Sequence, residues 1–525
     1  MNNFSNSNKL SKLIDIGISL SKEKNINILL EKILNEARVL TNSDGGTVYL
    51  ISNENQKLSF KIMQTESLNI KFGGSAEPVP DYIYPVKLYN EDGTKNLNNV
   101  SAVCALTGKT INIKDAYEND NYDFSGVKGF DKKHNYYSKS FLNVPLKDHK
   151  DKVIGVLQLL NPKKDGDIIS FTDELVELVE ALSSQASVAL TNQLLIEEQK
   201  ILFRSFIKLV VDALDKKDPV TGGHCNRVPL LTMMIAEYIN SDTTIYNDCH
   251  FNEDEMDEIF VAGWLHDFGK VATPDHIMNK STKLQGLYDK IDQVKLRFEI
   301  LKRDIELNFY KSKLSKIDTK EIDEQIKQVN EDFKFLEASN IGGEFMSEEL
   351  QNRVHDIAKQ KIKLDDKHCS ILNEKEVDFL TIKRGTLSDE DRQIMENHVS
   401  LSYELLDKLP YPEHLKQVPF YAGCHHEKLN GGGYPNGYSG DQLPLQARII
   451  AIADVFEGLT APDRPYKEPY KLSKALDILK FMVNDGEIDP DLFNLLITKK
   501  LYLKYANEHL NPEQIDSIDE EKLLS

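Results

Sequence analysis

The run Trp264-Leu265-His266-Asp267-Phe268-Gly269-Lys270 places a histidine directly before an aspartate in an apolar segment. A carboxylate can bridge two cations while the neighbouring imidazole binds one of them. Imidazole and carboxylate ligands without thiolate suit Fe, Mn, Zn or Ni. The pair therefore indicates a metal site, although an isolated His-Asp pair could equally be an ordinary structural feature of a helix.

The pair belongs to an ordered series of seven metal-type side chains in the second half of the chain. These are His224, His266, Asp267, His398, His425, His426 and Asp454. Seven ligands are too many for one tetrahedral ion and enough for two. Two ions about 3.5–4 Å apart are the usual device for hydrolysing a phosphate ester. The series predicts a two-metal phosphohydrolase.

Residues 205–485 also resemble a known family, the HD-GYP proteins. The carrying segments are DPVTGGHCNRV at 218–228, LHDFGK at 265–270, PD at 274–275, MNK at 278–280, NHV at 397–399, HHE at 425–427, GGGYP at 431–435, AIADV at 451–455 and DRPYK at 463–467. The resemblance implies an all-α, HD-type, metal-dependent phosphodiesterase. Such an enzyme opens cyclic di-GMP to the linear dinucleotide pGpG, or cuts on to GMP.

The resemblance further implies two divalent metal ions, with Fe or Mn favoured and Zn or Ni acceptable. One ion would be held by His224, His266, Asp267 and Asp454, and the other by His398, His425, His426 and the shared Asp267. Some members hold a third ion through a Glu four residues before the first histidine. Here that position is Val220, so we expect two ions.

Lys270, Tyr434, Arg464 and Lys467 are the expected substrate-binding residues, and Lys270 joins Asp267 as a catalytic residue. Lys270 lies one helical turn from His266 and Asp267 and could reach a phosphate oxygen. Arg464 and Lys467 could hold the second phosphate, and Tyr434 could stack on the ligand. The alternatives are a surface lysine, a solvated loop pair and a packed loop aromatic. Glycines 431–433 permit positive φ and a close backbone approach.

A long stretch at about 285–385 interrupts the HD-GYP pattern. Apolar residues near helical spacing, including Leu287, Ile291, Val294 and Phe298, predict a helical hairpin, and Gly342-Gly343 breaks it. This insertion could be a dimer contact, a lid or a solvated decoration.

Residues 10–190 predict a separate α+β domain, with a helix near 10–40, strands near 46–50, 58–62, 141–146 and 153–160, and a helix near 173–199. GTVYL at 46–50, SKS at 138–140, VPL at 144–146 and IGVLQLLN at 154–161 resemble a GAF domain, which implies an unidentified small-molecule ligand. Asn161, Lys163, Phe171, Asp173 and Glu174 also resemble a cyclic-nucleotide signature. A strand end, a loop and a helix capped by Thr172 explain the same residues, and we favour that structural interpretation.

Residues 186–217 carry apolar residues without Pro or Gly, which predicts a long connecting helix. It could pair with its copy in a homodimer or pack on its own chain. We expect a helical, acidic tail at 486–525, with 511–525 frayed and solvated.

Composition limits the classes of partner. A net charge of −20 argues against binding a nucleic-acid polymer through a basic field. The sequence has neither a signal peptide nor a run of about 20 apolar residues, so we expect a cytoplasmic protein without a membrane partner. The five scattered cysteines argue against disulfides, and Cys225 and Cys424 are expected to be packed neighbours of the ligands.

Two alternatives to a cyclic di-GMP phosphodiesterase stay open. The same site could act on another cyclic dinucleotide or on a nucleotide phosphate. The chain could also bind a cyclic dinucleotide as a signalling module without cutting it.

Overall fold

The computed structural model describes residues 2–52, 56–217, 223–312, 319–342, 345–364, 367–462 and 469–525. Its contacts divide the chain into two compact units, Met1–Phe203 and Arg204–Ser525. No helix in these ranges is both long and apolar enough to cross a bilayer.

Unit 1 is built on one antiparallel sheet. In the spatial order β3-β2-β1-β7-β6-β5, its strands are Ile70–Gly73, Lys57–Thr65, Ser43–Ser52, Val153–Lys164, Phe141–Lys147 and Ile111–Ile113. The short strands β4 (Val86–Lys87) and β8 (Asp167–Ile168) pair with β2 and β7. Every pairing is antiparallel, as expected for strands joined by turns and short excursions.

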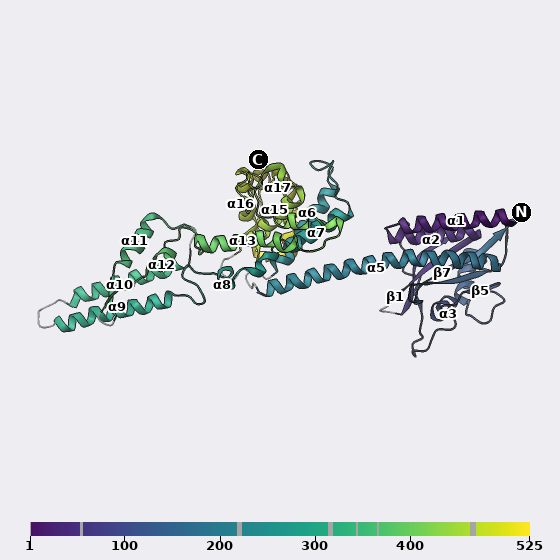
Figure 1. Ribbon diagram of the computed structural model, residues 1–525, viewed down its shortest axis with the longest axis horizontal. Helices are drawn as coiled ribbons and strands as arrows, with labels where there is room; N and C mark the ends of the chain where they lie inside the picture. Colours follow the sequence, from purple (N-terminus) through teal and green to yellow (C-terminus); the bar gives the residue numbers. More distant parts are fainter. Residues whose placement is uncertain are drawn as a thin grey trace. The chain divides into compact units, whose positions relative to one another are not determined.

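Side-chain alternation gives this sheet two different faces. Val48, Leu142 and Leu157 belong to a core shared with α1 (Asn2–Lys22), α2 (Ile26–Thr41) and the first part of α5 (Asp173–Lys217). Their neighbours Tyr49 and Phe141 belong to the opposite face, which α3 (Val100–Thr107) and α4 (Ser125–His134) cover. Figure 1 shows the sheet with α1 and α2 on one side and α3 on the other. The α+β expectation for this part of the chain is confirmed.

The residues of the cyclic-nucleotide-like signature make structural contacts. The Asn161 side-chain oxygen accepts hydrogen bonds from the backbone amides of Lys139 (2.8 Å) and Ser140 (3.2 Å). The Lys163 ammonium pairs with the buried Asp44 carboxylate at 2.5 Å. The Thr172 hydroxyl accepts from the backbone amide of Leu175 in the first turn of α5. These contacts favour the structural interpretation of the signature.

Unit 2 is mainly helical. Outside the insertion it comprises α6 (His224–Ser241), α7 (Glu253–Leu265), η1 (Phe268–Ala272), α8 (Asp275–Met278), α13 (Asp389–Leu406), η2 (Glu413–Leu415), α14 (Val418–Ala422), η3 (Gly440–Gln442), α15 (Leu445–Thr460), α16 (Leu472–Asn484), α17 (Pro490–Thr498), α18 (Leu501–His509), η4 (Pro512–Gln514) and α19 (Glu520–Leu524). Its largest core joins α6, α15, α16, α17 and α18, with Ile235, Phe456, Leu476, Phe493 and Tyr505 fully or almost fully buried. The expectation of an all-α body with a mainly helical insertion is confirmed, apart from one short strand pair inside the insertion.

The expectation of a frayed, solvated end at 511–525 is wrong. The buried Gln514 amide donates to the carbonyl oxygens of Thr460 (2.9 Å) and Tyr470 (3.2 Å). Asp516 accepts from the backbone amide and hydroxyl of Ser473, and Leu523 enters the main core. The acidic composition of residues 511–525 gave no sign of the buried Leu523 side chain or of these polar contacts. The tail therefore packs as part of unit 2.

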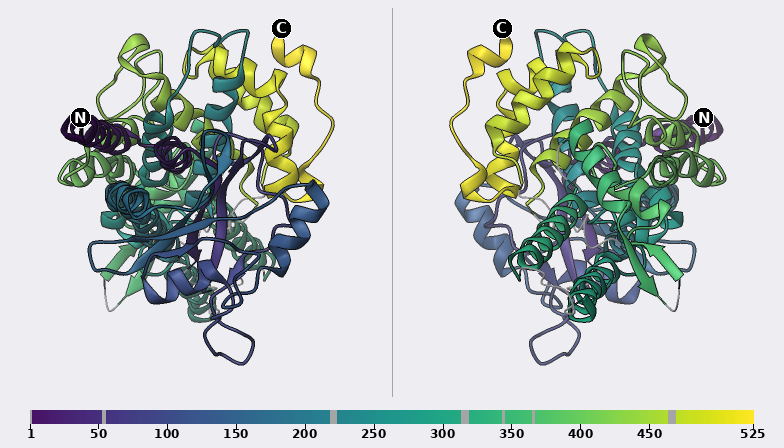
Figure 2. Two further views of the ribbon diagram at one scale, coloured as in Figure 1. Left: turned by 90° about the vertical axis from the view of Figure 1, so that its right-hand side faces the viewer. Right: turned by 90° about the vertical axis from the view of Figure 1, so that its left-hand side faces the viewer.

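The insertion is larger than a hairpin. It comprises α9 (Ile291–Ser312), α10 (Thr319–Asn340), α11 (Glu348–Ala358), β9 (Lys361–Leu364), β10 (Lys367–Ser370) and α12 (Glu374–Leu380). α9 and α10 lie side by side, as predicted (Figure 2). α11, α12 and the strand pair add to a separate core that includes Phe298, Leu336 and Ile362. At its base, Lys280 pairs with Asp391 of α13 at 2.6 Å.

Candidate metal centre

The structure brings all seven predicted ligands together from five places in unit 2. His224 opens α6, and His266 and Asp267 lie between α7 and η1. His398 lies within α13, His425 and His426 follow α14, and Asp454 lies on α15.

A close backbone contact joins two of these places. Gly269 of η1 meets α13 so closely that an added Cβ would lie 1.9 Å from the His398 carbonyl oxygen and 2.6 Å from the Ser402 amide nitrogen. The Gly269 amide also donates to the Ser402 hydroxyl at 2.7 Å. Only glycine permits this approach, which sets the His266-Asp267 pair beside His398.

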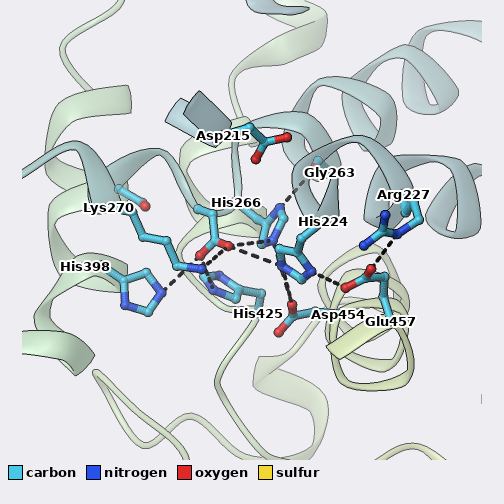
Figure 3. A network of polar contacts seen from close by, with 12 residues as sticks. Asp215, His224, Arg227, Gly263, His266, Lys270, His398, His425, Asp454 and Glu457 are labelled. Carbon is cyan, nitrogen blue, oxygen red and sulfur yellow. Dashed lines mark hydrogen bonds and ion pairs between the residues drawn. The ribbon is translucent and has the colours of Figure 1, made fainter. Parts of the chain in front are cut away.

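The first ligand group is His224, His266 and Asp454, whose donor atoms all lie within 4.8 Å of one another. The His224 Nε2 atom is 3.2 Å from Asp454 Oδ1 and 3.3 Å from Asp267 Oδ2. The His266 Nε2 atom is 3.3 Å from the same Asp267 oxygen. Figure 3 shows the side chains of His224, His266 and Asp454 pointing toward one another.

The second group is His398, His425 and His426, with donor atoms again within 4.8 Å of one another. The other carboxylate oxygen of Asp267 faces this group. Asp267 Oδ1 is 3.2 Å from His398 Nε2 and 3.8 Å from His425 Nε2. Asp267 therefore offers one oxygen to each histidine group.

Three of the imidazoles are fixed by their other nitrogen. His266 Nδ1 lies 2.7 Å from the Gly263 carbonyl oxygen, His398 Nδ1 2.6 Å from that of Met395, and His425 Nδ1 2.6 Å from that of Ala422. A proton on Nδ1 leaves Nε2 as an acceptor, which is the usual arrangement of a metal-binding histidine. All three Nε2 atoms are buried without a hydrogen-bond partner. Such an orphan atom is costly unless something binds it, so this donor set fits divalent metal ions.

His224 is fixed by a carboxylate. Its Nδ1 atom hydrogen-bonds to fully buried Glu457, and Glu457 accepts from the Arg227 side chain at 2.7 Å (Figure 3). Neither Glu457 nor Arg227 has a role predicted from the sequence. The sequence held one signal for Glu457, which is its position about one helical turn after Asp454. Residues that are three apart share a helix face.

The pKa of His224 is shifted in the opposite direction from those of His425 and His426. Burial alone would lower the pKa of His224, but Asp267, Asp454 and Glu457 raise it well above its ordinary value. Burial lowers the pKa of His425 well below its usual range and that of His426 to about 4. His425 and His426 are therefore neutral and ready to bind a cation.

The two acidic ligands stay charged. Burial would raise the pKa of Asp267, but Lys270 and His266 hold it well below the ordinary value. The pKa of Asp454 is lowered in the same way, because His224 outweighs the cost of burial. Two ionised carboxylates therefore lie among the imidazoles.

Two predicted substrate-binding residues lie beside the ligands. The Lys270 ammonium is 2.6 Å from Asp267 Oδ2. The Tyr434 ring stacks on His426 with centroids 4.9 Å apart, and its amide donates to the His426 carbonyl oxygen at 3.2 Å. Arg464 and Lys467 lie outside the described residues, as does Val220.

The glycine-rich loop is folded on itself. A Cβ on Gly433 would lie 2.4 Å from the Lys428 amide nitrogen, so the close approach that glycine permits is to the loop's own backbone. Gly431 has φ +78°. Buried Glu427, which has no role predicted from the sequence, accepts from the backbone amides of Asn436 (2.7 Å) and Tyr438 (3.0 Å). These contacts hold Tyr434 beside the ligands.

The cysteines take no part in disulfides. All five are free thiols, as expected, and Cys225 and Cys424 are buried next to ligand histidines. The two ligand groups found among the described residues contain no thiol.

Comparison with protein families agrees with the two units. A GAF domain model matches residues 25–190, and two HD domain models match residues 221–369 and 375–492. The two HD matches meet inside the insertion, and the structure joins them, since α6 of the first packs on α15 of the second. The chain thus combines a GAF domain with an HD domain, and both resemblances are confirmed at this level.

Known relatives match short parts of this chain. A 3'3'-cGAMP-specific phosphodiesterase 3 of Vibrio cholerae is 38% identical over 22% of this chain and 24% of its own length. The cyclic di-GMP phosphodiesterase response regulator RpfG of Xanthomonas campestris is 38% identical over 19% of this chain and 26% of its own. A cyclic di-GMP phosphodiesterase of Thermotoga maritima is 34% identical over 19% and 26%. The chain spans about a quarter of the length of these relatives.

Proposed function

We propose that unit 2 is a metal-dependent phosphodiesterase that hydrolyses cyclic di-GMP to pGpG, GMP or both. The observation that carries this proposal is the position of Asp267, whose two carboxylate oxygens face separate histidine groups 3.2–3.8 Å away. A shared carboxylate between two imidazole groups is suited to two ions at the spacing used for phosphate-ester hydrolysis. The names of the relatives add support for the substrate class.

The ligand assignment follows the two groups. His224, His266, Asp267 and Asp454 would hold one divalent ion, and His398, His425, His426 and Asp267 the other. When bound, the two ions supply a hydroxide at neutral pH and positive charge beside the phosphate. Fe or Mn are the favoured metals, with Zn or Ni as alternatives.

The chain's own residues would bind and orient the phosphodiester. The Lys270 ammonium, which is paired with Asp267 at 2.6 Å, would lie within reach of a phosphate bound at the ions that Asp267 holds. There it would offset the charge that develops on a non-bridging oxygen. Tyr434 would present its ring edge or hydroxyl from the loop that Glu427 fixes. Arg464 and Lys467 stay predicted contacts for the second phosphate.

Unit 1 would regulate this activity by binding a small molecule. An open pocket of about 920 Å³ lies on the sheet face opposite α1 and α2, and Tyr49, Phe60, Phe124, Phe141 and Gln158 are among its lining residues. A cyclic dinucleotide substrate supports a cytoplasmic location.

The first experiment combines activity and metal content. Anaerobically purified protein is incubated with cyclic di-GMP, products are separated by chromatography, and metal is counted on the same sample. We expect pGpG or GMP at about two ions per chain. Asp267→Ala should lose metal and activity together, and retained stoichiometry in this variant would contradict the bridging assignment. A fully metallated protein that binds the dinucleotide without cutting it would favour the binding-module alternative.

A second substrate is favoured by one observation. Relatives named as 3'3'-cGAMP-specific phosphodiesterases match as well as those named for cyclic di-GMP, with 38% and 43% identity over 115 and 77 residues. Competition between the two dinucleotides in one reaction decides between them. Faster loss of 3'3'-cGAMP at equal concentrations would reassign the substrate while leaving the metal centre unchanged.

A further inference from the structure

The last helix of the insertion, α12, contacts a buried ion pair at the start of α13. The Lys280 ammonium lies 2.6 Å from Asp391 Oδ2 and 4.2 Å from the centre of the Phe379 ring. The Lys280 side chain is only 4% exposed, so its charge has lost most of its water. A desolvated cation is attracted to the face of an aromatic ring. Lys280 is therefore held by the main body of unit 2 through Asp391 and by the insertion through Phe379.

The ion pair fixes the first turn of α13. Asp391 is the third residue of that helix and forms a capping box with Ser388. Burial alone would raise the pKa of Asp391, but Lys280 holds it below its ordinary value, so the carboxylate is charged. Thr386 adds a contact by donating its hydroxyl to the Lys280 carbonyl oxygen at 2.9 Å. The start of α13 is thus tied to the segment that follows α8.

His398 lies on the same face of α13 as Asp391. Seven residues separate the two, which is close to two helical turns. A tilt of α13 would therefore move the His398 Nε2 atom, which lies 3.2 Å from Asp267 Oδ1. The Gly269 contact holds α13 near His398, and the Lys280 pair holds it near its start. Two attachments fix the direction of the helix axis, whereas one would let the helix pivot.

The position of α12 is set inside the insertion. The Arg297 guanidinium of α9 makes a bidentate pair with Glu376, with distances of 2.9 and 2.7 Å. Leu380 is fully buried in the core of the insertion, and the Lys283 ammonium donates to its carbonyl oxygen at 3.1 Å. The fold of the insertion therefore determines where the Phe379 ring meets Lys280.

We propose that Phe379 is a positioning residue for the second ligand group. Through Lys280 and Asp391 it holds the start of α13, and with it His398, in the orientation that the second ion needs. This role rests on the two-ion centre proposed above. The insertion then supports one ligand helix of its own chain.

Three variants of the full chain separate this role from ordinary packing. Phe379→Leu removes the ring and keeps an apolar side chain. Phe335→Leu is the matched control, because the Phe335 ring also packs on the core of the insertion and lies 4.2 Å from the Arg353 guanidinium, within the insertion. Phe379→Tyr keeps the ring, and the open pocket of about 770 Å³ that Phe379 lines has room for the added hydroxyl. Circular dichroism checks that each variant is folded.

Hydrogen exchange at residues 389–398 of the metal-free chain is the first measurement, because it depends neither on metal nor on activity. We expect about tenfold faster exchange in Phe379→Leu, as the loss of a desolvated cation–π contact implies. Phe335→Leu and Phe379→Tyr should exchange as the unsubstituted chain does. Equal exchange in Phe379→Leu and Phe335→Leu would overturn the proposal.

Chelator competition with metal counting is the second measurement. Phe379→Leu should lose one of its two ions at about tenfold lower chelator concentration, the low end of the effect of removing a contact behind a ligand. The other ion should be held as in the unsubstituted chain. Equal weakening of both ions would overturn the proposal. If no variant binds two ions while exchange at 389–398 still differs, the two-ion centre fails and the hold of Phe379 on α13 stands.

A double-mutant cycle with Lys280→Met tests the route through the ammonium. Once the charge is gone, Phe379→Leu should cause no further loss of the weakened ion and no further rise in exchange, because coupled residues are not additive. Additive effects of the two substitutions would show that Phe379 does not act through Lys280 and would overturn the proposal.

Discussion

At the scale of single residues, Glu457 contacts the first proposed ligand group through His224 without being a proposed ligand. It hydrogen-bonds to His224 Nδ1 and is held by Arg227 at 2.7 Å. Removing such a partner commonly weakens metal binding about 10–100-fold. We therefore expect this loss in Glu457→Ala and a smaller one in Glu457→Gln, which keeps an acceptor for His224. Chelator competition on the full chain measures it.

The control for Glu457 is Asp441→Ala, which removes an exposed carboxylate on η3. It should bind metal as the unsubstituted chain does. If Glu457→Ala and Glu457→Gln lose the same amount, the negative charge of Glu457 supports His224, and its packing and acceptor oxygen add nothing. If neither loses affinity, His224 does not need this partner.

For Lys270 we expect the opposite result, in which metal binding is kept and turnover falls. Its ion pair with Asp267 occupies a ligand oxygen, so Lys270→Ala should retain two ions per chain. Turnover should fall roughly 10²-fold, the typical cost of removing one charge-stabilising donor from a reaction centre. Lys474→Ala, on the exposed face of α16, is the control. Unchanged turnover in Lys270→Ala would leave this lysine with a structural role only.

At the scale of elements, the contact between η1 and α13 sets the distance between the two ligand groups. A methyl group at Gly269 would need the space of the His398 carbonyl oxygen, 1.9 Å away. We expect Gly269→Ala to push α13 away, to lower the thermal midpoint and to reduce the metal count below two. Gly286→Ala has no atom within 4 Å of the added Cβ and should change neither quantity. Full metal occupancy in Gly269→Ala would show that this contact adapts without cost to the site.

At the scale of the whole molecule, the last helix completes the core of unit 2. Leu523 is 4% exposed and its neighbour Leu524 is 41% exposed, which gives two adjacent leucines in opposite environments. Leu523→Ala should cost about 2–5 kcal/mol in the free energy of unfolding, and Leu524→Ala within roughly 0.5 kcal/mol. Denaturant titration compares them. Equal losses of unfolding free energy in the two variants would show that the tail is solvated, as its composition suggests.

Much of this molecule follows from local sequence. The strands predicted near 46–50, 58–62, 141–146 and 153–160 lie within β1, β2, β6 and β7. The proposed ligand set can also be read from the sequence, because these histidines and aspartates appear in the HD-GYP order. The first two helices of the insertion follow from apolar spacing alone.

Other features depended on residues far apart in the chain. Glu457 gains its role only when α15 meets α6, since its place one turn after Asp454 does not by itself show that it contacts His224. Gln514 and Leu523 are buried because their partners lie on the α15–α16 connection and in the core, so an acidic composition gave no sign of their contacts. The small strand pair and α11 form where α9 and α10 leave apolar surface to cover. The sequence by itself determined the kinds of element and the chemistry of the ligands. Tertiary structure alone decided the pairing of the two Asp267 oxygens with separate histidine groups, because that depends on distances between helices that no local pattern encodes.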